Sequence, residues 1–277
     1  MNKELFELHT EIKSFIKDKS SSFKLDLPTT LFKRELKAVY RKLVLIRVAE
    51  LLSGINLLAK ENNGIGCIIL SRSLFELYMQ IAFIFKVDNL HAFRSYFYYA
   101  DYQSLIKLTK VEQKHLSNEE NYNDLQSRIS NISNEVQYFD YKKETRLFKA
   151  YFSKTFTDVE VNISENGENY WASLNFEKLS DFLGSDITKL YKLYYWQFSN
   201  LVHSTPRGII EGYQDVKDNN RKWVETALVF SSDLSSRLIN ILFKGQPEIE
   251  LYASICGIQG RLNDICGKLE SSLPSKC

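Results

Sequence analysis

Apolar residues recur at three- and four-residue spacing along most of this chain, which predicts a series of amphipathic helices. Leu5, Leu8, Ile12 and Ile16 form one such stripe and predict a helix over residues 3–19. A break follows, and a long helix reaching about Asn62 is expected after an N-cap at Thr29 or Thr30.

The same spacing predicts further helices over residues 65–87, 89–115, 119–150, 175–183, 186–204, 221–243 and 247–271. Residues 154–170 mix β-branched residues with a polar turn and are expected to be irregular. Pro206 and Gly208 are expected to stop a helix, before a polar loop over residues 217–220.

These elements predict an all-α fold, a single bundle-like domain of about eight or nine helices. The chain has only 4 Pro and 11 Gly in 277 residues, which leaves little material for a flexible linker. We expect an N-terminal helix and linker over residues 1–28 and a helical domain over 29–277. Within that domain, residues 40–210 carry the core motifs and 221–271 the C-terminal helices.

The helix predicted over residues 65–87 is apolar nearly all round and long enough to cross a bilayer, but Arg72, Glu76 and Gln80 project from one side. Two charges near the centre of a membrane span cost several kcal/mol. This segment is therefore expected to be a buried core helix, and no membrane partner is expected.

Composition adds few restrictions. The formal net charge of +2 gives no global reason to expect a nucleic acid or a membrane surface. The four cysteines form no Cys-x-x-Cys pair, so neither a zinc site nor a redox motif is indicated, and we expect no metal or cofactor. Cys67 is expected to be buried. The amphipathic N-terminus is unlike a signal peptide, and we therefore expect a cytoplasmic location.

Tyr191, Tyr195, Ser199 and His203 follow one another in strict steps of four, so a helix would place them on one face about 18 Å long. At the end of that helix, His203 is suited to act as acid, base or hydrogen-bond anchor. The alternative is that Ser199 and His203 only satisfy each other or the backbone in a packed core.

Arg72 and Glu76 lie one turn apart on the most apolar helix, where an unpaired charge would be costly. We expect them to pair with each other and to contact the helix face described above, giving a cluster with Tyr195, Ser199 and His203. A structural network and an active site with perturbed pKa values both fit this cluster.

The aromatic run after Arg94, residues 96–102, also has two interpretations, core packing and a base-stacking platform. Its spacing favours core packing.

Two segments, LSRSLFELYMQIAFI and YKLYYWQFSNLVHSTPRG, resemble the bacterial family catalogued as domain of unknown function 5677 over roughly residues 40–210. Like its members, the chain pairs an Arg-x-x-x-Glu helix with a Tyr-x-x-x-Tyr-x-x-x-Ser-x-x-x-His helix. The resemblance implies an all-α fold.

More distantly, a helix that ends in a polar residue, three spacers and histidine is similar to HEPN domains. Many of these are metal-independent ribonucleases of toxin–antitoxin and phage-defence systems. Their usual arginine before the histidine is missing here from Trp196 to Phe198, so Arg72 or Arg207 would have to supply the charge.

The resemblance therefore implies a HEPN-like core, a role in defence or stress response, and RNA cleavage with His203 as acid or base. Arg72 or Arg207 would stabilise phosphate charge. Ser199 and Glu76 complete the expected catalytic set, with Tyr191, Tyr195 and Arg207 as ligand contacts. RNA, a partner protein or a second copy of the chain are the partners expected. The alternative is a non-catalytic module in which the Arg72, Glu76 and His203 cluster binds a ligand or only specifies the fold.

Overall fold

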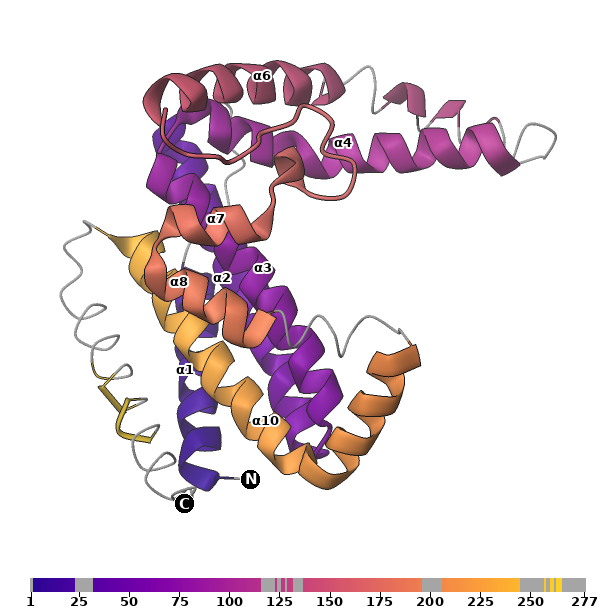
Figure 1. Cartoon of the computed structure of the whole chain (residues 1–277). Coiled ribbons are helices and arrows are strands. Elements are labelled where there is room, and N and C mark those ends of the chain that lie inside the picture. The colour runs from indigo at the N-terminus through magenta and orange to yellow at the C-terminus, as the bar shows by residue number, and fades with distance from the viewer. Residues whose placement is uncertain are drawn as a thin grey trace. The chain divides into compact units, whose positions relative to one another are not determined.

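The computed structural model describes residues 2–22, 32–115, 137–195 and 206–244, with isolated positions between 123 and 131 and between 257 and 265. All regular elements in these ranges are helical, which confirms the predicted all-α fold. They are α1 (Lys3–Ser22), α2 (Lys33–Lys60), α3 (Gly64–Val87), α4 (Leu90–His115), α6 (Gln137–Thr155), the 3₁₀ turn η1 (Trp171–Ser173), α7 (Phe176–Leu183), α8 (Ser185–Leu190), the π-helix η2 (Tyr191–Tyr195) and α10 (Pro206–Phe243) (Figure 1).

The chain divides into two compact units. Unit 1 comprises residues 1–27, 38–82 and 185–277, so it holds α1, most of α2 and α3, α8, η2 and α10. Unit 2 comprises residues 28–37 and 83–184 and holds α4, α6, η1 and α7. The division expected at residue 28 stays a prediction.

Helix α3 is the apolar helix expected over residues 65–87. Leu74, Phe75 and Met79 are fully buried, and so is Cys67, as predicted. Burial raises the pKa of the Cys67 thiol to about 12, so it stays protonated as a small hydrophobic residue. The helix is long and apolar enough to cross a membrane, and 56% of its most apolar 18-residue stretch is buried within the protein. Core helices of soluble proteins share that length and composition.

The polar loop predicted after Pro206 is wrong, whereas the end predicted for the preceding helix lies outside the described residues. Pro206 is the first residue of α10, and the helix runs on to Phe243 through the polar residues 217–220 that were expected to form a loop. Proline is tolerated in the first turn, where its missing N–H has no helical acceptor. Figure 1 shows that the ribbon of α10 changes direction part-way along.

The polar residue Asn220 also has a structural role that a loop would not require. Its Oδ1 accepts a hydrogen bond of 2.7 Å from the backbone N–H of Gly64, and its Nδ2 donates to the carbonyl of Asn62. Asn220 therefore caps the first turn of α3 from another helix.

In unit 2, α6 lies along α4 (Figure 1). Of the helix expected over 119–150, the structure describes isolated helical positions between 123 and 131 and the helix α6, which begins at Gln137 and continues to Thr155. Tyr102 stacks on Tyr141 at 4.1 Å between ring centroids, and Tyr96 meets Trp171 edge-on at 5.2 Å. Core packing, the interpretation favoured for this aromatic run, is thus confirmed for Tyr96 and Tyr102.

Helix α1 packs on α10 in unit 1 (Figure 1). His9, on α1, is completely buried. His9 Nε2 lies 2.9 Å from Ser231 Oγ, while its Nδ1 has no hydrogen-bond partner among the described residues. Burial lowers the pKa of His9 to about 4, against a smaller opposite effect of the Asn56 amide; Lys13 lowers it slightly further. The ring is therefore neutral in the folded chain at pH 7.

This burial predicts a stability loss in mild acid. Below pH 6.5 the unfolded chain takes up a proton on His9 that the folded chain does not bind, so unfolding becomes easier as the pH falls toward 4. Between pH 7.5 and pH 5.0 this difference should remove about 2 kcal/mol from the free energy of unfolding. Urea titrations at the two pH values measure it.

The matched variant is His9→Leu, which removes the titrating ring and keeps apolar volume. Ser231 Oγ would still donate to the Ala227 carbonyl at 2.6 Å. The loss between pH 7.5 and pH 5.0 should be smaller in this variant by about 2 kcal/mol. An equal loss of free energy of unfolding in the wild type and in His9→Leu would contradict the assignment to His9.

Candidate functional site

Three side chains from the two sequence motifs meet in unit 1. Arg72 Nε donates to Glu76 Oε1 at 3.1 Å, and the Tyr195 hydroxyl donates to the same oxygen at 3.0 Å. Arg72 Nη2 donates to the Tyr195 hydroxyl oxygen at 3.4 Å. The three residues, called the Arg–Glu–Tyr triad below, thus form a closed ring of hydrogen bonds across elements more than 100 residues apart.

Local helix geometry explains two sides of this ring. Arg72 and Glu76 are one turn apart on α3, which brings their side chains to the same face. Tyr195 is the last residue of the π-helix η2, which was predicted as ordinary α-helix. Single π-turns often occur at functional sites. Tyr191 still stacks on Tyr195, with ring centroids 5.3 Å apart, as the four-residue spacing predicts.

Aromatic side chains pack against the triad. Phe75 is fully buried on α3, and the centre of its ring lies 5.4 Å from that of Tyr195 and 5.7 Å from that of Phe230 of α10. The ring centres of Tyr194 and Phe230 lie 4.8 Å apart. The sequence interpretation missed Phe75, although its place next to Glu76 on the apolar side of α3 is a signal that could have identified it. These rings fix Tyr195 against α3.

Burial and charge set the state of the triad. The Arg72 side chain is 12% exposed and that of Glu76 28% exposed. Burial, then the Glu76 charge, raises the pKa of Tyr195, so its hydroxyl stays protonated and acts as a donor. Burial alone would lower the pKa of Arg72, but Tyr195 and Glu76 outweigh it and raise that pKa. Arg72 is therefore a fixed cation.

The triad leaves polar edges for a ligand. Among the described residues, none makes a hydrogen bond with Arg72 Nη1 or Glu76 Oε2. The guanidinium carbon lies 5.2 Å from the centre of the Tyr195 ring, which keeps the guanidinium over the aromatic face. The arrangement can present one N–H donor edge and one carboxylate oxygen to a partner.

The other predicted site residues are only partly placed. Ser199 and His203 lie outside the described residues, and so does the side chain of Arg207, whose backbone belongs to α10. The predicted meeting of Arg72 and Glu76 with Tyr195 is confirmed. The predicted contact of this cluster with Ser199 and His203 stays a prediction.

The family model described as "Family of unknown function (DUF5677)" matches residues 42–222, more than half of the chain. The chain belongs to this family. Searches of curated proteins and of solved structures give no match. The segment that matches DUF5677 includes the Arg–Glu–Tyr triad, Tyr191, Ser199, His203 and Arg207.

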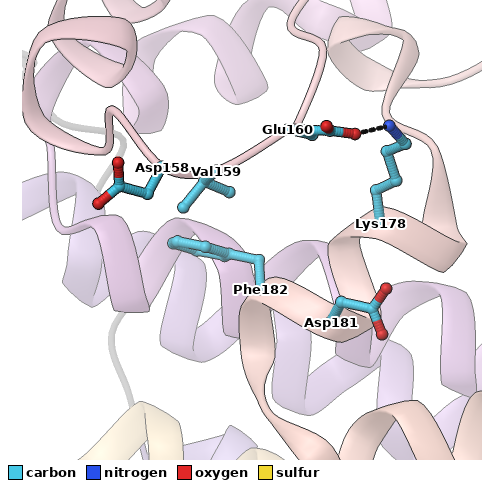
Figure 2. A pocket seen from close by; sticks show the side chains of 6 residues that line it. All are labelled: Asp158, Val159, Glu160, Lys178, Asp181 and Phe182. Carbon is cyan, nitrogen blue, oxygen red and sulfur yellow. Dashed lines mark hydrogen bonds and ion pairs between the residues drawn. The ribbon is translucent and has the colours of Figure 1, made fainter.

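The DUF5677 segment also contains a surface cavity in unit 2, with a volume of about 280 Å³. It lies between α7 and the irregular segment before η1, and its lining residues are Asp158, Val159, Glu160, Lys178, Asp181 and Phe182 (Figure 2). Figure 2 shows Lys178 reaching the Glu160 carboxylate, with which it forms an ion pair. Three carboxylates against one ammonium make this cavity unfavourable for a phosphate group.

No residue of the Arg–Glu–Tyr triad lines that cavity. Within the described ranges, no group of three or more His, Cys, Asp or Glu side chains is placed to hold a metal ion. The triad is accordingly the described group of the DUF5677 segment that best fits the site predicted from the sequence.

Proposed function

We propose that this DUF5677 protein is a HEPN-like helical ribonuclease of bacterial defence or stress response that acts in the cytoplasm. Its site would combine the Arg–Glu–Tyr triad with His203. The observation that supports the proposal is the contact of Arg72 and Glu76 with Tyr195, because Tyr195 belongs to the series in steps of four that continues to Ser199 and His203.

RNA cleavage without a metal needs a base for the 2′-hydroxyl and a cation beside the phosphate. In the proposed step, His203 takes the proton of the 2′-hydroxyl and the oxygen attacks phosphorus. The bond from phosphorus to the 5′-oxygen breaks, and the leaving oxygen takes up a proton from solvent or a protein acid. Arg72, with Arg207 as the second candidate, stabilises the extra negative charge on phosphate.

One observation favours the alternative, a structural or ligand-binding cluster without catalysis. The triad members hydrogen-bond to one another, and unit 1 holds a second group of an arginine, a carboxylate and a tyrosine. In that group Arg237 Nε donates to Asp233 Oδ2 at 2.7 Å and interacts with Tyr78. Such groups often do no more than fix helix register.

The Arg72→Lys variant separates the two functions. Lysine keeps the positive charge, but it lacks the planar guanidinium that donates N–H bonds to Glu76 and Tyr195 at the same time. The positive charge is therefore no longer held in a fixed position. If the triad is catalytic, cleavage of labelled single-stranded RNA by the purified chain should fall by about tenfold, equivalent to about 1.4 kcal/mol. Melting temperature is recorded in parallel.

The matched control is Arg237→Lys, which changes a half-buried arginine of a comparable pair, with side chains 31% and 20% exposed. It should leave RNA cleavage unchanged. Equal cleavage by the wild type, Arg72→Lys and Arg237→Lys, or no cleavage by the wild type, would overturn the ribonuclease proposal. Loss of stability in Arg72→Lys without any RNA effect would support the structural alternative.

A further inference from the structure

Helix α6 of unit 2 carries an excess of positive charge. Its basic residues are Lys142, Lys143, Arg146, Lys149 and Lys154, and its acidic residues are Asp140 and Glu144. Asp140 is half-buried, and Glu144 is 5% exposed with its Oε2 2.6 Å from His91 Nδ1 of α4. Helix α1, of similar length, has four basic and four acidic residues. The charge of α6 is therefore not a general property of the helices of this chain.

The buried side of α6 determines which of its residues point outwards. Tyr141, Phe148 and Phe152 are at most 2% exposed. Phe148 stacks on Trp171 with 5.7 Å between ring centroids, and Tyr141 stacks on Tyr102 of α4. These contacts fix α6 in the core of unit 2, where it lies along α4 (Figure 1). The residues on the opposite side of the helix face solvent.

Lysines and two apolar side chains share that outer side. Lys143, Leu147 and Tyr151 follow one another in steps of four, and Lys154 comes three residues later, so the four residues form a strip about 17 Å long. Leu147 is 40% and Tyr151 36% exposed, and both lysines are exposed as well. The strip therefore combines positive charge with an aromatic ring that solvent reaches.

Arg146 and Lys149 extend the positive charge beside this strip. The Arg146 side chain is 70% exposed, and its Nε lies 3.8 Å from Glu165 Oε2, a pair that solvent screens. Among the described residues, none forms an ion pair with the exposed lysines of α6 that lie on this side. We call this surface the α6 basic face; its residues are Lys143, Arg146, Leu147, Lys149, Tyr151 and Lys154.

The chemistry of the α6 basic face matches a flexible polyanion that carries flat rings. Phosphates of a single-stranded nucleic acid attract lysine and arginine side chains, and its unpaired bases stack on aromatic rings. Tyr151 offers such a ring, and Leu147 adds apolar surface on the same strip. A membrane surface fits less well, because a helix that lies in a membrane buries a continuous apolar face and lysines stand at both ends of this strip.

We propose that the α6 basic face binds single-stranded RNA and is separate from the Arg–Glu–Tyr triad. Its four cations contact phosphate oxygens, and one base stacks on Tyr151. The choice of RNA over DNA rests on the proposed ribonuclease function, whereas the binding of a single strand does not.

Fluorescence anisotropy of a labelled 2′-O-methyl oligouridine of about 16 nucleotides tests this binding on the full-length chain. The oligomer lacks the 2′-hydroxyl that attacks in the proposed cleavage, so binding is measured whether or not the chain cleaves RNA. Lys143→Gln combined with Lys149→Gln should raise the Kd by about 20-fold at about 0.1 M salt. The slope of log Kd against log salt concentration should fall by about 1.4, because two phosphate contacts are lost.

The ring of Tyr151 is tested in the same assay. Tyr151→Leu keeps an apolar side chain but removes the stacking surface, so it should raise the Kd by about fivefold or more. Tyr151→Phe keeps the ring and should bind as the wild type does. Equal binding by Tyr151→Leu and Tyr151→Phe would overturn the stacking of a base on this residue.

The matched control for charge is Lys3→Gln combined with Lys17→Gln, which removes the same charge from two exposed positions of α1. It should leave the Kd unchanged. If the α6 double variant loses its helical circular dichroism, Lys149→Gln combined with Lys154→Gln replaces it. Equal Kd values for the wild type and the folded α6 variant, or an equal loss in the α1 variant, would overturn the proposal.

Competition separates RNA from an acidic protein partner. Unlabelled polyuridine should displace the oligomer, whereas polyglutamate at the same concentration of charges should not, and equal displacement by both would overturn the assignment to RNA. Arg72→Lys should bind the oligomer as the wild type does. Cleavage of RNA without binding at the α6 basic face would therefore overturn only this inference, and binding without cleavage only the ribonuclease function.

Discussion

His203→Ala is expected to slow RNA cleavage by about 10²–10⁴-fold, because it removes the proposed acid or base and leaves the cation of Arg72 in place. The three hydrogen bonds of the Arg–Glu–Tyr triad do not involve His203, so the variant keeps the groups that form them. Initial rates on labelled single-stranded RNA, together with growth of cells that express the protein, measure the effect.

The control is His115→Ala, a change of a histidine in unit 2 at the end of α4. It should leave both cleavage and toxicity at the level of the wild type. Unchanged cleavage and toxicity in His203→Ala would remove this histidine from the mechanism and leave the binding module as the better account.

Glu76→Ala is expected to lower the free energy of unfolding by about 3 kcal/mol. The change leaves the Arg72 guanidinium, 12% exposed, without its charge partner and the Tyr195 hydroxyl without its acceptor. Loss of one partner from a buried pair costs more than the pair contributes, because the other charge stays desolvated. Urea-induced unfolding followed by circular dichroism measures the difference.

Glu50→Ala is the matched control. Arg47 and Glu50 form an ion pair of 3.0 Å on α2, but their side chains are 59% and 58% exposed. Solvent screens such a pair, so this variant should change stability by less than about 0.5 kcal/mol. A similar small loss in Glu76→Ala would show that the triad is not a buried network.

Local sequence signals were sufficient for most helices. Asn175, proposed as the start of a short helix, is its N-cap and accepts from the backbone N–H groups of Glu177 and Lys178. Gly184 ends that helix with a φ of +134°, a conformation that side chains rarely adopt. Pro206 was interpreted only as the end of a helix, although proline also suits the first turn of the next one, so the part of α10 before residue 221 was missed.

The candidate site could be predicted only in part. The pairing of Arg72 with Glu76 follows from helical spacing, and its contact with Tyr195 was inferred because a buried charge needs partners. The π-turn at Tyr191–Tyr195 has no such signal in the sequence. The pairing of His91 with Glu144 had none either, because the two residues are 53 positions apart and meet only when α6 packs on α4.

The central structural claim is that the two motif segments meet through the triad, and a double-mutant cycle tests it most directly. Glu76→Ala, Tyr195→Phe and the double variant are unfolded in urea. Because the Tyr195 hydroxyl donates to a charged, half-buried carboxylate at 3.0 Å, we predict a coupling free energy of about 1.5 kcal/mol. Effects that add to within about 0.3 kcal/mol would contradict the contact between the two motif segments.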